Sequence, residues 1–115
     1  MTATNYDTTI DQGADWYITF VYQDSTGTPI NITNYTGAMQ LRSEPYDSTA
    51  VLSLTTGSGI TITGATGTVA VHATAAQTSA ILDGYYFYDL EITSQSGIVT
   101  RLVQGQIKVS AQVTR

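Results

Sequence analysis

The residues of this chain that could do acid–base or metal chemistry are few and far apart in the sequence. His72 is the only histidine and there is no cysteine, so neither a thiolate metal site nor a disulfide is available. A serine-based triad needs a nucleophile on a strained elbow such as Gly-x-Ser-x-Gly, and that pattern does not occur. We therefore expect His72 to be a solvent-facing residue of a strand.

The carboxylates offer two further possibilities. Asp89 and Glu91 lie two apart on one strand face, roughly 6–7 Å from each other by the rise of a strand. A glycosidase pair could use that separation, but paired carboxylates on a strand more often form a solvated face, which is the interpretation we favour. The stretch 24–27 is too short for a calcium loop and lacks the later bidentate glutamate. The sequence thus predicts no catalytic residue, no cofactor and no metal ion.

The composition indicates which classes of binding partner are expected. Nine acidic residues against four basic ones give a net charge of -5, which would repel a nucleic-acid backbone, so no nucleic-acid partner is expected. Only 11% of the residues are charged, whereas threonine supplies 21 of the 115. Threonine and tyrosine can cover a solvated strand face without charge. Such a surface is consistent with a protein fixed in an assembly.

The length suits a single domain, 1–115. No apolar run approaches the ~20 residues of a membrane span, so no membrane partner is expected. The polar start of the chain has neither the basic nor the apolar region of a signal peptide.

Extended segments dominate the chain, and the most regular of them is 84–92. Tyr86, Tyr88, Leu90 and Ile92 share one face of that segment, while the opposite face turns acidic. This alternation is typical of a strand that packs on a core with one side. Seven or eight such strands between turn signals predict an all-β fold, an antiparallel β-sandwich. The strands are expected at 5–11, 15–23, 38–43, 51–54, 60–62, 69–71, 84–92 and 98–112.

One short helix is expected near 74–82, because Thr74 and Gln77 form a capping-box pattern. In the last expected strand, 98–112, the position of Arg101 leaves the strand register open. Arg101 shares the parity of the core valines, so either it lies beyond the edge of the core or the register shifts nearby. A bulge or bend is plausible at Gly105.

The start of the central strand resembles a known structural device. Gly84-x-Tyr86 after a helical turn resembles the tyrosine corner of immunoglobulin-like sandwiches, in which the tyrosine hydroxyl bonds to upstream backbone. Tyr88 would then stand where antibody domains carry their second cysteine. We assign structural roles to Trp16, Gly84, Tyr86, Tyr88 and Leu90.

A wider resemblance covers most of the chain. It rests on the stretches 9–14, 24–42, 84–92 and 97–105, taken in that order. Together they resemble small virion proteins of tailed phages and the N-terminal domain of phage baseplate upper proteins. In that family D-x-x-G-x-P-x-(D/N)-(L/I)-T precedes a strand, as in 24–33 here. A strand G-x-Y-x-Y-D-(L/I) precedes a terminal hairpin, as in 84–90.

The resemblance implies a non-enzymatic structural component of a virion, such as a baseplate, tail or neck adaptor or a decoration protein. Its partners would be other virion proteins, in multiple symmetric copies, after assembly in the host cytoplasm. We expect the contact surface on the last strand and tail, where a neighbour could add a strand beside this edge. The candidate contact residues are Arg42, Arg101, Gln104, Gln106, Lys108 and Arg115.

The alternative is a carbohydrate-binding module for adhesion to a host surface. Aromatic side chains are the usual platforms for sugar rings. The candidates are Trp16, Tyr17, Tyr35, Tyr46 and Tyr85.

Overall fold

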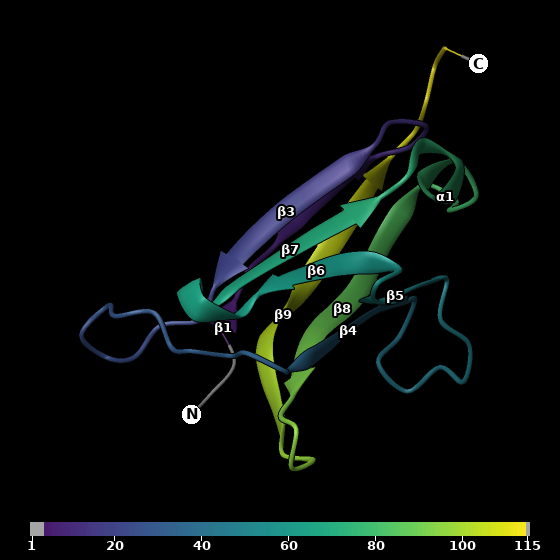
Figure 1. Ribbon diagram of the computed structural model, residues 1–115. Helices are drawn as coiled ribbons and strands as arrows, with labels where there is room; N and C mark the ends of the chain where they lie inside the picture. The colour runs from purple at the N-terminus through teal and green to yellow at the C-terminus, as the bar shows by residue number, and fades with distance from the viewer. Residues whose placement is uncertain (1–3, 115) are drawn as a thin grey trace.

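Nine strands lie between residues 4 and 114, the part of the chain that the computed structural model describes (Figure 1). A 3₁₀ turn η1 (Gly64–Thr66) and the helix α1 (Ala75–Ser79) complete the regular structure of those residues. The predicted all-β class with one short helix is confirmed. The strands are β1 (Thr4–Asn5), β2 (Thr8–Asp11), β3 (Trp16–Val21), β4 (Thr36–Arg42), β5 (Leu52–Thr56), β6 (Gly59–Thr63), β7 (Thr68–Ala73), β8 (Gly84–Thr93) and β9 (Val99–Ser110).

The strands form one sheet that curls until its two limbs face each other across the core (Figure 1). One limb has the order β9-β8-β4-β5, with β1 and β2 on the other side of β9, and the second limb has the order β6-β7-β3. A two-residue parallel pairing of β5 with β6 joins the limbs. β1 and β2 also run parallel to β9. The sheet is therefore mixed, whereas a purely antiparallel arrangement was predicted.

A single apolar core fills the space between the limbs. The four β8 residues predicted to face it, Tyr86, Tyr88, Leu90 and Ile92, are all buried. Trp16 from the opposite limb is only 8% exposed and belongs to the same core. Burying one large aliphatic side chain contributes about 1.5–3 kcal/mol, so these residues supply much of the stability of the fold. Its other completely buried members are Ile10, Ile32, Leu41, Val69, Ala73 and Ile107.

The tyrosine corner predicted at the start of β8 is present. The Tyr86 hydroxyl donates a hydrogen bond of 2.6 Å to the carbonyl oxygen of Leu82. Burial, followed by the negative charge of Asp83, raises the pKa of Tyr86 above its ordinary value. The bond fixes the loop between α1 and β8 onto the core.

The first strand is interrupted at Tyr6 and Asp7, where a single strand over 5–11 was expected. Side chains replace the backbone ladder at this break. The Tyr88 hydroxyl donates to the Tyr6 carbonyl oxygen (2.5 Å), and the Asp7 carboxylate accepts from the backbone N–H of Gln106 (2.9 Å). The Tyr6 N–H still reaches the carbonyl oxygen of Gln104 at 2.8 Å. The segment therefore stays attached to β9 across the interruption.

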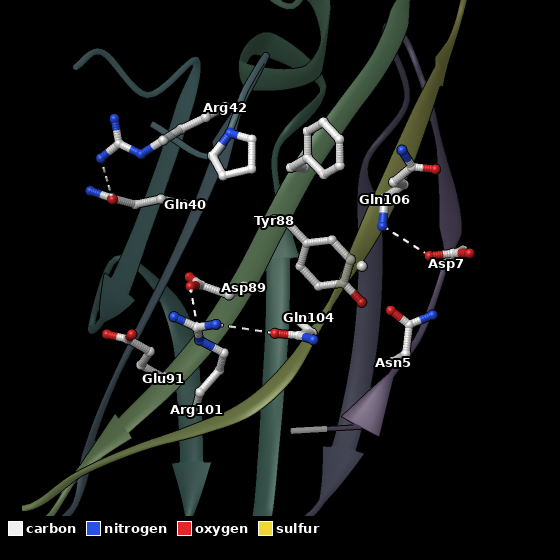
Figure 2. A pocket seen from close by; sticks show the side chains of 13 residues that line it. Asn5, Asp7, Gln40, Arg42, Tyr88, Asp89, Glu91, Arg101, Gln104 and Gln106 are labelled. Carbon is white, nitrogen blue, oxygen red and sulfur yellow. Dashed lines mark hydrogen bonds and ion pairs between the residues drawn. The ribbon is translucent and has the colours of Figure 1, made fainter. Parts of the chain in front are cut away.

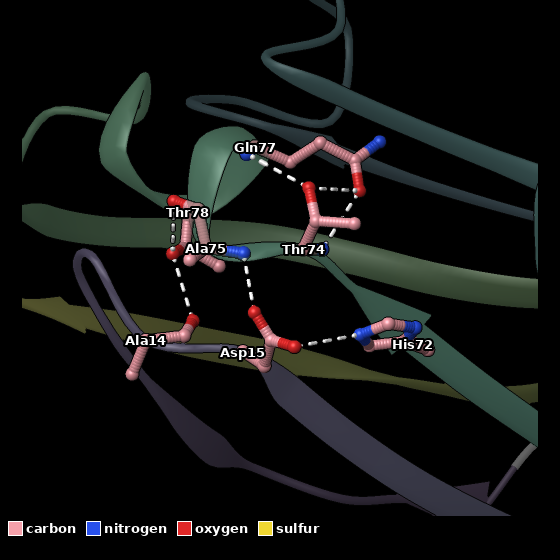
Figure 3. A network of polar contacts seen from close by, with 7 residues as sticks. All are labelled: Ala14, Asp15, His72, Thr74, Ala75, Gln77 and Thr78. Atoms are coloured by element: carbon pink, nitrogen blue, oxygen red, sulfur yellow. Dashed lines mark hydrogen bonds and ion pairs between the residues drawn. The ribbon is translucent and has the colours of Figure 1, made fainter.

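The helix α1 is anchored by polar contacts to the turn between β2 and β3 (Figure 3). The predicted capping box is formed by Thr74 and Gln77. Asp15 accepts a 2.7 Å hydrogen bond from the backbone N–H of Ala75. The fully buried Thr78 hydroxyl donates to the Ala14 carbonyl oxygen at 2.9 Å and accepts from the N–H of Gly13 at 3.0 Å. These bonds hold a helix that is too short to be stable alone.

Candidate functional site

An open hollow of about 650 Å³ lies on the face of β4, β8 and β9 that points away from the core, and it extends to β1 (Figure 2). Strand pairing arranges its lining in rows. Arg42, Phe87 and Gln106 form one row across the three strands. Gln40, Asp89 and Gln104 form the next row. The floor is therefore made of amide and charged groups around one phenyl ring.

A bulge in β9 turns Arg101 into this hollow. Leu90 pairs with Val103, whereas the next residue, Glu91, pairs with Arg101, so Leu102 is the extra residue. A one-residue insertion moves every following side chain to the other face of a strand. Arg101 would otherwise point toward the core with Val103. Of the two alternatives left open for Arg101, the structure has the register shift, which lies at Leu102, whereas Gly105 pairs regularly with Tyr88.

Both arginines of the hollow are held in place by neighbouring groups. The Arg101 Nε lies 3.4 Å from the Asp89 carboxylate, and its Nη1 donates to the Gln104 side-chain oxygen at 3.1 Å (Figure 2). Arg42 donates to the Gln40 side-chain oxygen at 2.7 Å and to the Asp47 carbonyl oxygen at 2.8 Å. Because the Arg101 and Asp89 side chains remain 53% and 36% exposed, their ion pair adds little stability and stays accessible to a ligand.

The hollow carries both signs of charge. Asp7, Asp89 and Glu91 line it together with the two arginines. Asp89 and Glu91 face outward, as the solvated-face interpretation predicted. The Asp89 carboxylate forms an ion pair with Arg101. Such a lining suits a partner that offers charged and amide groups of its own.

The structure brings together four of the six predicted contact residues, Arg42, Arg101, Gln104 and Gln106. Lys108 is exposed on the same face of β9 but lies outside the hollow, and Arg115 lies outside the described residues. Sequence reasoning missed Asn5, Asp7, Gln40 and Phe87. Residues two apart on a strand share a face, so Gln40 could have been predicted beside Arg42 and Phe87 beside Asp89. The two N-terminal residues join the site only through a parallel pairing with a strand about a hundred residues away, which no local pattern predicts.

The expectation that a neighbour adds a strand along β9 is wrong for most of that strand. β9 lies inside the sheet, with β8 on one side and β1 and β2 on the other. These pairings occupy its backbone groups over much of its length, so a further strand has no edge to join there.

His72 faces solvent in part, as expected for a strand residue. Its Nε2 lies 3.4 Å from the Asp15 carboxylate, and its ring stacks on Tyr17 with centroids 4.3 Å apart. Neither contact is with a serine, threonine or cysteine side chain. Over residues 4–114 no group of three or more His, Cys, Asp or Glu is placed to hold a metal ion. The same residues include no helix long and apolar enough to cross a membrane.

The aromatic residues suggested for sugar binding do not form one platform. Trp16 belongs to the core, so its proposed role as a sugar platform is wrong. Tyr17, Tyr46 and Tyr85 are 68%, 84% and 68% exposed. They lie on β3, in the loop between β4 and β5, and on β8.

Comparisons with known proteins add little to this description. No family model and no curated protein matches the chain. Among solved structures it is similar to the soluble domain of PmoD from Methylocystis sp. ATCC 49242 (Rockwell). The identity is 14%, the match covers 89% of this chain and 77% of that chain, and the TM-score is 0.48. A likeness this weak carries no inference about function.

Proposed function

We propose that this protein is a non-enzymatic structural component of a tailed-phage virion and that it acts through protein–protein contacts. It would serve as a baseplate, tail or neck adaptor or as a decoration protein. Its partners would be other virion proteins, present in multiple symmetric copies. The virion assignment is supported by the sequence resemblance described above.

The observation that carries the binding part of the proposal is the hollow on β4, β8 and β9. Its arginines are oriented by Gln40, Asp89 and Gln104, so their positions are set before a partner arrives. Preorganised groups lose less conformational entropy on binding. The guanidinium groups of arginine can bind carboxylates of another protein, and side-chain amides can bind its backbone N–H and C=O groups. Phe87 adds an apolar contact surface within the hollow.

The non-enzymatic part is supported by the surroundings of the groups that could react. His72 is engaged with Asp15 and Tyr17, and Asp89 is engaged with Arg101. Among the described residues, the hydrogen bond of the His72 side chain goes to Asp15, and no serine or threonine hydroxyl bonds to it.

Mass spectrometry of purified phage particles tests the proposal. Trypsin can cut the given sequence only after Arg42, Arg101 and Lys108, whereas chymotrypsin can cut after its eight tyrosines, two phenylalanines and one tryptophan, so chymotrypsin should be used. We expect peptides of this chain in washed, intact particles at a constant ratio to a known tail or capsid protein. Absence from the particles, with recovery in the soluble lysate, would contradict the proposal.

A further inference from the structure

The strand β3 ends one side of the sheet and is paired on one side only. Its six residues, 16–21, pair with β7, and no other strand of the described chain pairs with them. In Figure 1 the ribbon of β3 runs along the margin of the molecule. An edge of this length presents a row of backbone groups that another strand could use.

The backbone groups that point outward from this edge can be identified. The N–H of Tyr22 donates to Gly67 on the side of β7 at 2.8 Å. Since the hydrogen-bonding direction alternates along an antiparallel strand, the even-numbered residues of β3 bond to β7. Tyr17, Thr19 and Val21 therefore direct their N–H and C=O groups away from the sheet. Their side chains are also exposed.

This edge lacks the features that prevent strands from associating. β3 contains no charged residue, proline or glycine. The residues that neighbour it on the outer face of β7 and β6 include no carboxylate, lysine or arginine either: they are Thr61, Thr63, Thr68, Ala70 and His72. By contrast, the opposite end of the sheet carries Asp7 and Asp11. The core-facing side chains of Ile18 and Phe20 are only partly buried, so β3 leaves apolar surface uncovered.

We propose that β3 pairs antiparallel with β3 of a second copy of this chain, about a two-fold axis at Thr19. In this register Thr19 faces Thr19 of the second copy, and Tyr17 faces Val21 of the second copy. An aromatic residue opposite a β-branched one is a favourable cross-strand pair. Asp15 faces Gln23 of the second copy, so no like charges meet. Ile18 beside Phe20 of the second copy covers the apolar surface that each copy leaves open.

The pairing uses each copy's β3 edge once, so the assembly closes as a dimer and does not grow into a fibre. It joins the two β6-β7-β3 limbs into one continuous sheet. The hollow on β4, β8 and β9 lies on the other limb. The dimer would form whatever binds in the hollow, and it does not depend on the proposed virion role.

Sedimentation velocity of the full chain, from about 1 µM to about 1 mM, tests the dimer, since this range covers the dissociation constants of weak to moderate complexes. We expect a reversible monomer–dimer equilibrium for the wild type. Thr19→Lys places two lysines against each other at the two-fold axis and should abolish the dimer. The matched control is Thr61→Lys, an exposed threonine in the same cross-strand row on β6, which should leave the dimer intact.

Amide exchange measured by NMR provides a second readout in the same samples. At high concentration the amides of Tyr17, Thr19 and Val21 should exchange slowly in the wild type and rapidly in Thr19→Lys. The Phe20 amide, which bonds to β7, should stay protected in both and so reports that the variant is folded. A wild type that is monomeric throughout would overturn the proposal. So would loss of the dimer in both lysine variants, because that result indicates stacking of the outer faces instead of edge pairing.

Discussion

Tyr88 links the two ends of the chain through one hydroxyl group. Its bond to the Tyr6 carbonyl oxygen spans 82 residues of sequence. Burial is the main reason that the pKa of Tyr88 lies above its ordinary value, and the nearby Asp7 and Tyr6 add to the effect. Ionising this phenol therefore costs more in the folded protein than in the unfolded chain.

The stability that depends on this raised pKa should be complete below the ordinary tyrosine pKa of about 10 and should fall as the pH rises above it. Urea unfolding between about pH 9 and pH 11 should show this decline in the wild type. Tyr88→Phe should lower the free energy of unfolding by about 1 kcal/mol at neutral pH and should decline less steeply in alkali. The control is Tyr85→Phe, an exposed neighbour whose profile should match the wild type. Equal alkaline slopes for Tyr88→Phe and the wild type would rule out this role.

Thr78 is the second residue whose hydroxyl connects distant segments. Thr78→Val keeps the shape of the side chain but leaves the Ala14 carbonyl oxygen and the Gly13 N–H without their partner. An unsatisfied buried polar group costs about 1–3 kcal/mol, so the valine variant should unfold at lower urea. Thr78→Ser keeps the hydroxyl and should lose only about 0.8 kcal/mol for the missing methyl group. A valine variant as stable as the serine variant would contradict the hydrogen-bonding account.

At the scale of the elements, the β1–β2 segment depends on close packing against Gly105. A Cβ atom added to Gly105 would be placed against the Tyr6 carbonyl oxygen and the Asp7 carboxylate. Gly105→Ala should therefore push this segment off β9 and cost about 1–3 kcal/mol, the usual range for overpacking. Amide exchange should rise for Tyr6, Gln106 and the residues of β2. Amides of the β6–β7 hairpin serve as the internal reference, and equal acceleration there would show a global effect instead.

The elements also show what the sequence can and cannot predict. Alternation placed β8 on the core, and the Thr74–Gln77 pattern located α1, because both depend on neighbours within a few residues. The break at Tyr6 and Asp7 depends on Tyr88 and Gln106, which are distant in the sequence. A bulge or bend was thought plausible at Gly105 because glycine marks irregular strands, but the irregular residue is Leu102. Gly105 serves instead to admit the backbone of the N-terminal segment.

The candidate site was predictable only where it depends on residues that are close in the sequence. The positions of Gln104 and Gln106 on the outer face follow from strand parity in β9. Arg101 joins them only because the bulge reverses its direction, and Arg42 joins them through the pairing of β4 with β8. Strand neighbours and bulge positions are set by the whole sheet, so the hollow itself could not be read from the sequence.

At the scale of the whole molecule, the two outward faces differ in character. The face of β4, β8 and β9 carries the charged hollow, whereas β3, β7 and β6 contain no aspartate, glutamate, lysine or arginine. A protein with two unlike faces can contact two different neighbours in an assembly. Under the proposed function the hollow would contact another virion subunit, and the proposed dimer would use the β3 edge.

If the hollow is the contact surface, a substitution within it should reduce incorporation of the protein into particles. Arg101→Gln removes a charged fork from the hollow, whereas Lys108→Gln removes the same charge from an exposed site outside it on the same strand. Particles grown with each variant supplied in place of the wild type should incorporate Lys108→Gln normally and Arg101→Gln several-fold less. Quantitative mass spectrometry of washed particles measures the ratio, and circular dichroism of the purified variants checks their folding. Equal incorporation of the two variants would indicate that the hollow is not the contact surface.

A reconstruction of the intact phage particle by electron cryomicroscopy tests the central claim most directly. We predict density for this β-rich chain in repeated copies, with a different virion subunit seated in the hollow against Arg42, Phe87 and Arg101. A particle in which no density fits the chain, or in which every copy leaves that hollow open to solvent, would contradict the account.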